Sequence, residues 1–383
     1  MKSGRGGVKT SNADRHTDGT STEYNANLGT LFPSILFESG RRYIHIHHAK
    51  PSVLLIGSLA HTTAEWSALS TKYTLHEFRT GTRSQFLSRL KSNDFASVTA
   101  LYRSNASATL TGPFDREICA ALPSSLKYIC HNGAGYDNID VDAFTERGVL
   151  ISSTPIAVDN ATADTGIFLM LGALRYAVAP LEAIRRGEWR GKGTRVGHDP
   201  TGKVLGILGM GGIGRAMASR ARAFGMKIIY HNRSRLPAEL EGDAKYVTFE
   251  ELLAQSDVLS LNLALNAKTR HIISAREFAK MKDGVVIVNT ARGGLIKEAD
   301  LVEALDSGKV SAVGLDVFEE EPKVHEGLLR NDRAFIVPHI GTNTYETQRE
   351  MELLVLRNLE SAVDGNGLLT PIPEQKSKAN GNL

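Results

Sequence analysis

The stretch that most constrains the fold is residues 203–232, KVLGILGMGGIGRAMASRARAFGMKIIYHN. An apolar run leads into Gly-x-Gly-x-x-Gly at Gly209, Gly211 and Gly214, and a helical segment and a second apolar run follow. In such a unit the first glycine permits a tight turn, the second lets backbone approach a pyrophosphate, and the third brings the helix close to the strand. The helix N-terminus, with Gly212 and Ile213, offers free N–H groups to phosphate. The unit therefore predicts a parallel α/β sheet that binds a dinucleotide.

The residues after the second apolar run indicate which dinucleotide is preferred. An acidic residue at this place binds the ribose hydroxyls of NAD, but here the chain has Asn232, Arg233, Ser234 and Arg235. Asn232 removes the repulsion of a 2′-phosphate, and guanidinium groups suit phosphate. The pattern favours NADPH/NADP, with NADH/NAD as a possible second cofactor. The alternative, that both arginines are solvated loop residues, stays open.

Strand-like and helical segments alternate along most of the chain, which predicts an α/β fold of two doubly wound parallel-sheet domains. We expect a flavodoxin-like substrate domain over 51–153 plus 341–370, and a Rossmann nucleotide-binding domain over 154–340. Residues 1–50 are rich in Gly, Ser, Thr and Asn, which predicts a disordered extension, and 371–383 are expected to form a tail.

Composition excludes several classes of function. The net charge is only +3 and the arginines are scattered, so nucleic-acid binding has no support. The longest apolar run, 166–174, is too short to span a bilayer. The histidines of 45–48 lack partner ligands at useful spacing, so no metal is predicted. A cytoplasmic protein is expected. A mitochondrial leader is the alternative, but it is disfavoured because acidic residues soon follow the early basic ones. The C-terminus lacks Ser-Lys-Leu, the peroxisomal signal.

Three polar residues follow predicted strands of the second domain. Arg292 comes after GVVIVNTA, Glu321 after VSAVGLDVF, and His339 after FIVP. Ligands of doubly wound sheets bind outside the carboxyl ends of strands, so these side chains should meet in one crevice. An arginine for an anion, a histidine for a proton and a carboxylate to tune that histidine suit chemistry on a keto acid.

The motifs GMGGIGR, NTARGGLI, GLDVFEEEP and PHIG resemble the D-2-hydroxyacid dehydrogenase family over about 51–365. The segments LPSSLKYICHNGAGYDNIDV, NATADTGIFLMLGALR, GHDPTGK and YHNR are similar to fungal glyoxylate/hydroxypyruvate reductases within that family. The resemblance implies that Arg292 binds the substrate, that His339 is the general acid, and that Glu321 keeps His339 protonated. It also implies substrate contacts from the N–H groups of Ala134 and Gly135. Cofactor contacts are implied for Thr162, Thr290, Ala291, Asp316, His339 and Gly341.

The resemblance implies reduction of a small 2-keto acid to the D-2-hydroxy acid or an achiral product: glyoxylate to glycolate, and hydroxypyruvate to glycerate. It also implies a homodimer. A reductase of larger aromatic or branched 2-keto acids, and a nucleotide-sensing corepressor on the same fold, remain alternatives. Phosphoglycerate dehydrogenase is disfavoured because no phosphate site or regulatory domain is visible. Formate dehydrogenase is disfavoured because it lacks the acid partner of the histidine. Asn262 and Ala264 depart from the commonest family pattern, which leaves the shape of the substrate pocket open.

Overall fold

The computed structural model describes residues 34–38, 41–45 and 50–379, and the chain divides into two units, 1–49 and 50–383. In the first unit, β1 (Ser34–Glu38) and β2 (Arg41–His45) pair as antiparallel strands. Both strands lie within the extension of 1–50, whose disorder stays a prediction. Both contain isoleucine and an aromatic residue, types that favour strands.

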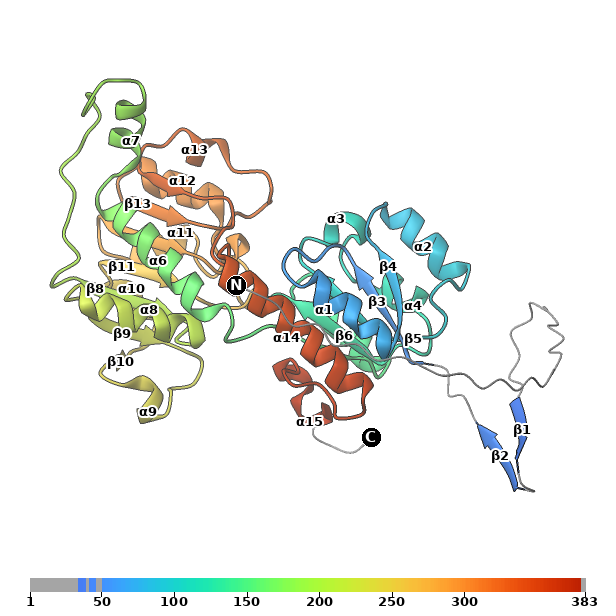
Figure 1. Cartoon of the computed structure of the whole chain (residues 1–383). Helices are drawn as coiled ribbons and strands as arrows, with labels where there is room; N and C mark the ends of the chain where they lie inside the picture. The colour runs from blue at the N-terminus through green and yellow to red at the C-terminus, as the bar shows by residue number, and fades with distance from the viewer. Residues whose placement is uncertain (1–33, 39–40, 46–49, 380–383) are drawn as a thin grey trace, which may run out of the picture. The chain divides into compact units, whose positions relative to one another are not determined.

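The first sheet of the second unit has five parallel strands in the order β4-β3-β5-β6-β7. This is the flavodoxin-like order, so that part of the expected fold is confirmed (Figure 1). The strands are β3 (Ser52–Ile56), β4 (Thr74–Phe78), β5 (Val98–Ser104), β6 (Tyr128–Asn132) and β7 (Leu150–Ser152). The helices are α1 (Thr63–Ala68), η1 (Leu69–Thr71), α2 (Arg83–Lys91), α3 (Ala108–Thr111), α4 (Arg116–Ala121), α5 (Val141–Glu146) and α14 (Tyr345–Val363).

Both faces of this sheet are buried over β3, β5, β6 and β7, whereas the edge strand β4 is partly exposed. Phe86, Ile118 and Phe144 of α2, α4 and α5 pack on one face, while Trp66 of α1 and Val355 of α14 pack on the other. Loops at the carboxyl ends of the strands are thereby left free to build a site.

The second sheet has seven parallel strands in the order β10-β9-β8-β11-β12-β13-β14, the Rossmann order extended by one strand. Its strands are β8 (Val204–Leu208), β9 (Lys227–His231), β10 (Lys245–Tyr246), β11 (Val258–Leu261), β12 (Val285–Asn289), β13 (Val310–Leu315) and β14 (Ala334–Ile336). Its helices are α8 (Gly212–Ala223), α9 (Ala238–Glu241), α10 (Phe249–Gln255), α11 (Ala275–Lys280), η2 (Gly293–Leu295), α12 (Glu298–Asp306) and α13 (Glu326–Leu329). The expected nucleotide-binding fold is confirmed.

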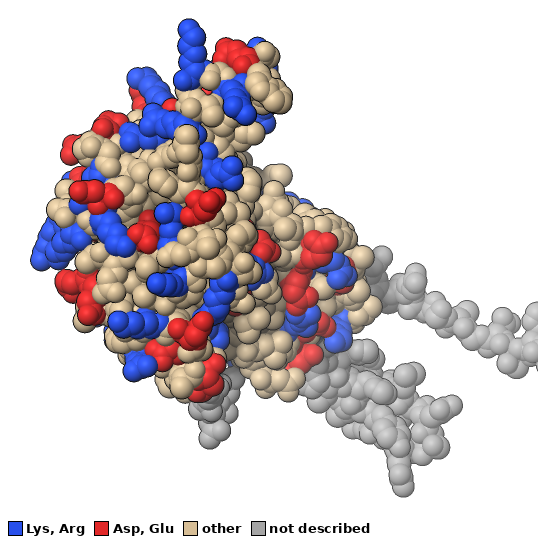
Figure 2. Space-filling model, turned by 90° about the vertical axis from the view of Figure 1, so that its left-hand side faces the viewer, with Lys and Arg blue, Asp and Glu red and all other residues tan. Residues whose placement is uncertain are grey.

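Two helices connect the sheets in sequence. α6 (Asp159–Leu174) packs on α8 and on the second sheet, and α7 (Val178–Arg185) follows after a bend of 81°. In the described part of the chain, no single helix is long and apolar enough to cross a membrane, and only this bent pair is both when its two helices are taken together. Basic and acidic side chains are interspersed over the face shown in Figure 2.

The C-terminal segment returns to the first sheet. After α14 it forms η3 (Pro373–Gln375) and α15 (Lys376–Ala379). Gln375 is fully buried and its side-chain oxygen accepts the N–H of Ile151 at 2.8 Å, while its amide nitrogen donates to the carbonyl of Val149 at 3.0 Å. In the segment predicted to form a tail from 371, a buried glutamine thus bonds the start of β7.

Candidate functional site

The three residues that the sequence places after strands come from neighbouring strands of the second sheet. β12, β13 and β14 pair in parallel, so their carboxyl ends share one edge. Arg292, Glu321 and His339 follow these strands in turn. Arg292 and His339 line a cavity of about 540 Å³ that also reaches the loop after β6. Arg292 and His339 therefore meet at one cavity, whereas Glu321 bonds His339 without being one of the lining residues.

His339 and Glu321 form a hydrogen-bonded ion pair. The Nδ1 atom of His339 lies 2.7 Å from Oε2 of Glu321, whose Oε1 accepts the N–H of Phe318 at 3.0 Å. The pKa of His339 is raised: the bond to Glu321 is the largest cause, the charges of Glu321 and Asp316 add to it, and burial and the charge of Arg292 oppose it. Burial pushes the pKa of Glu321 up, but the bonds from His339 and Phe318 outweigh it and leave that pKa below its usual value. The pair thus favours a protonated histidine beside an ionised carboxylate.

Asp316 holds the turn that carries His339. Its carboxylate is buried and accepts the N–H of Ile340 at 2.6 Å and that of Gly341 at 2.8 Å. Burial raises its pKa, and the two backbone bonds oppose that rise. His339 itself has a left-handed backbone, with φ of 53°, which is uncommon for a residue other than glycine. Asp316, for which a cofactor contact was predicted, lines the cavity, and both its oxygens also fix the backbone next to His339.

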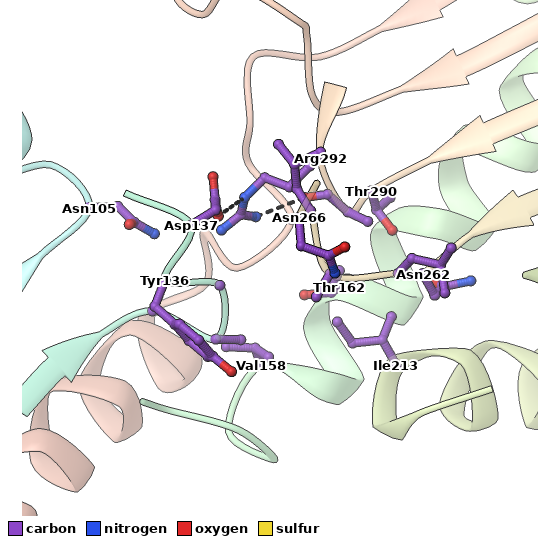
Figure 3. Close-up of a pocket in the computed structure, with 18 of the residues that line it drawn as sticks. Asn105, Tyr136, Asp137, Val158, Thr162, Ile213, Asn262, Asn266, Thr290 and Arg292 are labelled. Atoms are coloured by element: carbon purple, nitrogen blue, oxygen red, sulfur yellow. Dashed lines mark hydrogen bonds and ion pairs between the residues drawn. The ribbon is translucent and has the colours of Figure 1, made fainter. Parts of the chain in front are cut away.

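Arg292 reaches across the cavity to the loop that follows β6. Its Nε donates to Oδ1 of Asp137 at 2.8 Å, and NH1 donates to the carbonyl of Ala291 at 2.8 Å (Figure 3). A side chain on Gly135 would begin only 1.9 Å from the NH2 of Arg292, so the guanidinium lies directly against this glycine. Arg292 therefore needs Gly135, and an acidic side chain already occupies part of its donor set.

The loop of Gly133–Tyr136 presents unused backbone donors. The N–H of Gly133 binds Oγ1 of Thr154 at 3.1 Å, whereas those of Ala134, Gly135 and Tyr136 donate to no group in the described part of the chain. Free N–H groups beside a guanidinium suit an anionic ligand. This places the predicted substrate contacts Ala134 and Gly135 on the same cavity as Arg292.

The glycine motif has the geometry that a dinucleotide site requires. Gly209 has φ of 99°, and a side chain there would begin 2.7 Å from the carbonyl oxygen of Asn262. A side chain on Gly211 would meet nothing within 4 Å, so a ligand has room to approach. One on Gly214 would begin 2.4 Å from the carbonyl oxygen of Gly209. With α8 beginning at Gly212, these features fit the pyrophosphate of a dinucleotide.

The four residues after β9 differ in their availability. The side-chain oxygen of Asn232 accepts the N–H of Met210 at 2.7 Å. Arg235 is held by the buried Glu241, with its NH2 2.8 Å from Oε2. Arg233 and Ser234 are exposed, and neither forms a side-chain hydrogen bond or ion pair with any described residue. Of the two arginines expected to bind a 2′-phosphate, Arg233 is the one whose whole guanidinium is free of partners among the described residues, whereas Glu241 holds Nε and NH2 of Arg235.

The other predicted cofactor residues divide between the cavity and its surroundings. Thr162, Ile213, Thr290, Ala291 and Gly341 line the cavity together with Asp316 and His339. The glycines of the motif and residues 232–235 lie outside its lining. Among the described residues, no group of three His, Cys, Asp or Glu side chains is arranged to hold a metal, and His47 and His48 lie outside the described residues.

Several residues that line the cavity were not predicted from the sequence to belong to the site. Asp137 is the chief of these, and its signal was a carboxylate two residues after Gly135 in a loop expected to bind an anion. Asn262, one of the departures from the family pattern, lines the wall, and its Oδ1 is buried without a partner in the described part of the chain. Apolar side chains complete the wall: Ile139, Val141, Leu263, Leu265 and Met351.

Comparison with known proteins shows the family of the chain. The NAD-binding domain model of D-isomer specific 2-hydroxyacid dehydrogenases matches residues 167–341. The chain is 64% identical to 4-methyl-2-oxopentanoate reductase A of Aspergillus oryzae over 85% of this chain and 99% of that one. It is 44% identical to glyoxylate reductase 1 of Saccharomyces cerevisiae over 86% of this chain and 96% of that one. A crystal structure of a glyoxylate reductase from Paecilomyes thermophila superposes with a TM-score of 0.84 at 68% identity, covering 85% of this chain and 99% of that one. The chain, with its NAD-binding domain, belongs to the D-isomer specific 2-hydroxyacid dehydrogenase family.

Proposed function

We propose that this dehydrogenase reduces monocarboxylic 2-keto acids with NADPH, glyoxylate and hydroxypyruvate among them. The observation that carries the proposal is the meeting of Arg292, the free N–H groups of the loop after β6, and the His339–Glu321 pair around one cavity. A carboxylate, a carbonyl oxygen and a proton donor are the three elements that such a reduction has to align.

Each group has a distinct part in the proposed reaction. Arg292, with the N–H groups of Ala134 and Gly135, binds the substrate carboxylate and takes it from solvent into the cavity. His339 donates a proton to the carbonyl oxygen, and Glu321 holds the imidazolium in place through Nδ1 so that Nε2 is left to donate. The reduced nicotinamide, when bound, supplies the hydride. Asp137 occupies only Nε of Arg292, so the substrate carboxylate binds the guanidinium donors that remain, above all those of NH2.

The wall of the cavity favours a second candidate substrate class, branched 2-keto acids. Ile139, Leu263, Leu265 and Met351 offer apolar contacts that glyoxylate, which has no side chain, cannot use. One CH₂ group buried against such a wall is worth about 0.8 kcal/mol, or roughly fourfold in affinity. The name of the Aspergillus oryzae relative points the same way.

A steady-state assay tests the proposal and separates the two classes. The purified chain is assayed with NADPH and, in turn, glyoxylate, hydroxypyruvate, 4-methyl-2-oxopentanoate and phenylglyoxylate, and kcat/KM is compared. A higher value for the first two supports the small-substrate proposal, and a higher value for 4-methyl-2-oxopentanoate supports the branched class. Failure to reduce any of the four would refute the proposed function.

The proposed preference for NADPH over NADH is supported by the surroundings of the ribose site. No acidic side chain occupies positions 232–235, and the guanidinium of Arg233 is exposed with free donors. The dissociation constants of NADPH and NADH, measured by fluorescence, test this preference. Equal constants would contradict it.

We also propose a homodimer that uses α7 and the loop after it. Leu181, Ile184 and Trp189 are 46%, 52% and 73% exposed, which is unusual for large apolar side chains gathered in one region. Light scattering after size exclusion measures the mass directly. Trp189→Glu is expected to give a monomer, and an unchanged mass would place the interface elsewhere.

A further inference from the structure

Arg103 is a buried arginine that the proposed reaction does not use. It lies at the carboxyl end of β5 with no exposed surface, and its guanidinium carbon is 4.6 Å from the centre of the Phe114 ring. NH1 donates to Oδ1 of Asn138 at 2.9 Å, while Nε and NH2 have no partner in the described part of the chain. A buried charge with unmet donors lowers stability compared with an apolar side chain of the same size, so its presence calls for a positional role.

His131 stands directly beside Arg103 on the neighbouring strand. The two residues are partners in the register of β5 and β6, and NH1 of Arg103 lies 3.4 Å from Nδ1 of His131. On the other side of the ring, Nε2 lies 3.0 Å from the carbonyl oxygen of Gly135. A guanidinium can only donate, so Nδ1 accepts, and Nε2 carries the proton and donates to Gly135. Burial, followed by the charge of Arg103, lowers the pKa of His131 well below its usual value, in keeping with a neutral ring.

The carbonyl of Gly135 belongs to the loop that the proposed function uses to bind the substrate carboxylate. Because a trans peptide is planar, fixing this carbonyl also fixes the N–H of Tyr136, which points the opposite way. Gly133 makes the contact possible, since a side chain there would begin 2.7 Å from Nε2 of His131. Gly135 is thus held on one side by His131 and covered on another by Arg292.

We infer that Arg103 and His131 are positioning residues that hold the anion-binding loop of 133–137 ready for the substrate carboxylate, Arg103 acting through His131 and His131 through the carbonyl of Gly135. This inference rests on the proposed function, because it concerns the affinity of that loop for a 2-keto acid. It gives neither residue a contact with the substrate.

Two substitutions of His131 separate its two contacts. In His131→Gln the longer amide can still donate to the carbonyl of Gly135, whereas in His131→Asn the shorter amide stays beside Arg103 and does not reach Gly135. Loss of one hydrogen bond is worth about 0.5–1.5 kcal/mol, which is roughly a two- to tenfold change. With saturating NADPH, we expect His131→Asn to raise the KM of the 2-keto acid by this factor, with kcat and the dissociation constant of NADPH unchanged. His131→Gln should remain near the wild type.

Cys130→Ala is the matched control, because Cys130 is the adjacent residue of β6, is equally buried, and packs on the opposite face of the sheet. It is expected to lower the melting temperature without raising KM. Arg103→Met should raise KM in the same direction as His131→Asn. The double variant should be no worse than the more affected single variant, since Arg103 acts through His131. Fully additive effects would remove Arg103 from the inferred arrangement.

Hydrogen–deuterium exchange over residues 133–138 tests the inference without any substrate. The amides of this loop should exchange faster in His131→Asn than in His131→Gln, by a factor similar to that in KM. Equal exchange in the two variants would overturn the inference, as would a parallel loss of kcat, NADPH affinity and melting temperature in His131→Asn. If the wild type reduces no 2-keto acid, the proposed function fails by itself, and the exchange result still decides whether His131 holds the loop.

Discussion

The pH dependence of reduction should depend on the contact between Glu321 and His339. Reduction requires protonated His339. The hydrogen bond to Glu321 is the largest influence on the pKa of His339 and raises it, and Asp316 adds a smaller rise. Burial and the charge of Arg292 oppose this rise. The efficiency kcat/KM should therefore be full below the raised pKa and fall as pH increases through it. Glu321→Gln keeps the shape of the side chain but removes its charge, so the falling limb should move to lower pH.

The size of this movement follows from the geometry. Two unit charges about 4 Å apart interact by about 4 kcal/mol at an effective dielectric constant of 20. The side chains of His339 and Glu321 are 45% and 36% exposed, so water screens much of this interaction, and about 1–2 kcal/mol is a fairer value. Since 1.36 kcal/mol corresponds to one pH unit, the limb should move by roughly one unit.

The assay measures kcat/KM for a 2-keto acid with NADPH between about pH 5.5 and 9.5, a range that extends to both sides of the usual histidine pKa. Glu320→Gln is the control, because it removes the same charge from the adjacent residue, whose side chain is 73% exposed and pairs with Lys323. The control should leave the limb in place. If the limb of Glu321→Gln coincides with that of the wild type, the pair does not set the protonation of the donor, and the proposed role of Glu321 is wrong.

Three further predictions concern the cofactor and the substrate. Arg233→Ala should weaken the binding of NADPH by roughly ten- to a hundredfold, the value of a charge-assisted phosphate contact, and leave the binding of NADH unchanged. Arg235→Ala should affect the binding of the two cofactors equally. Fluorescence titration measures both affinities, and equal weakening in Arg233→Ala would contradict the role of Arg233. Arg292→Ala should reduce kcat/KM by about a hundredfold or more while NADPH binding stays normal. Arg292→Lys should recover only part of kcat/KM, since an ammonium cannot reproduce a two-pronged contact. Full recovery of kcat/KM would exclude that contact. Gly135→Ala should raise the KM of the 2-keto acid at least tenfold, because its Cβ would lie 1.9 Å from the guanidinium of Arg292; an unchanged KM would show that the arginine binds substrate from another position.

The structure has the geometry expected for the site where that geometry depends on local order along the chain. The strand–turn–helix unit contains Gly209, Gly211 and Gly214, and the role of each glycine follows from its neighbours in that unit. The structure has the tight turn, the open approach and the close packing that these roles require. Arg292, Glu321 and His339 each follow an apolar run, and parallel strands bring such positions to one edge. These features need no knowledge of how distant segments pack.

The missed features all depend on which side chains become neighbours in space. The sequence alone does not distinguish Arg233 from Arg235, yet the buried Glu241 binds Arg235 and leaves Arg233 without a partner among the described residues. Asp137 reads as a loop carboxylate until Arg292, 155 residues away, is found bound to it. Gln375 lies in the segment predicted to form a tail, and its amide completes the hydrogen bonds at the start of β7.

The sequence by itself determined the two parallel sheets, the dinucleotide turn and the three residues at the strand ends, because periodicity, glycine spacing and the alternation of strand-like and helical segments are properties of nearby residues. Only the tertiary structure decided which donors are free and which are already engaged. Hydrogen bonds and ion pairs form between whatever groups packing brings within about 3 Å, and no local pattern records that choice. The Arg103–His131 pair is the clearest case, since strand register alone made a buried arginine and a histidine neighbours beneath the loop.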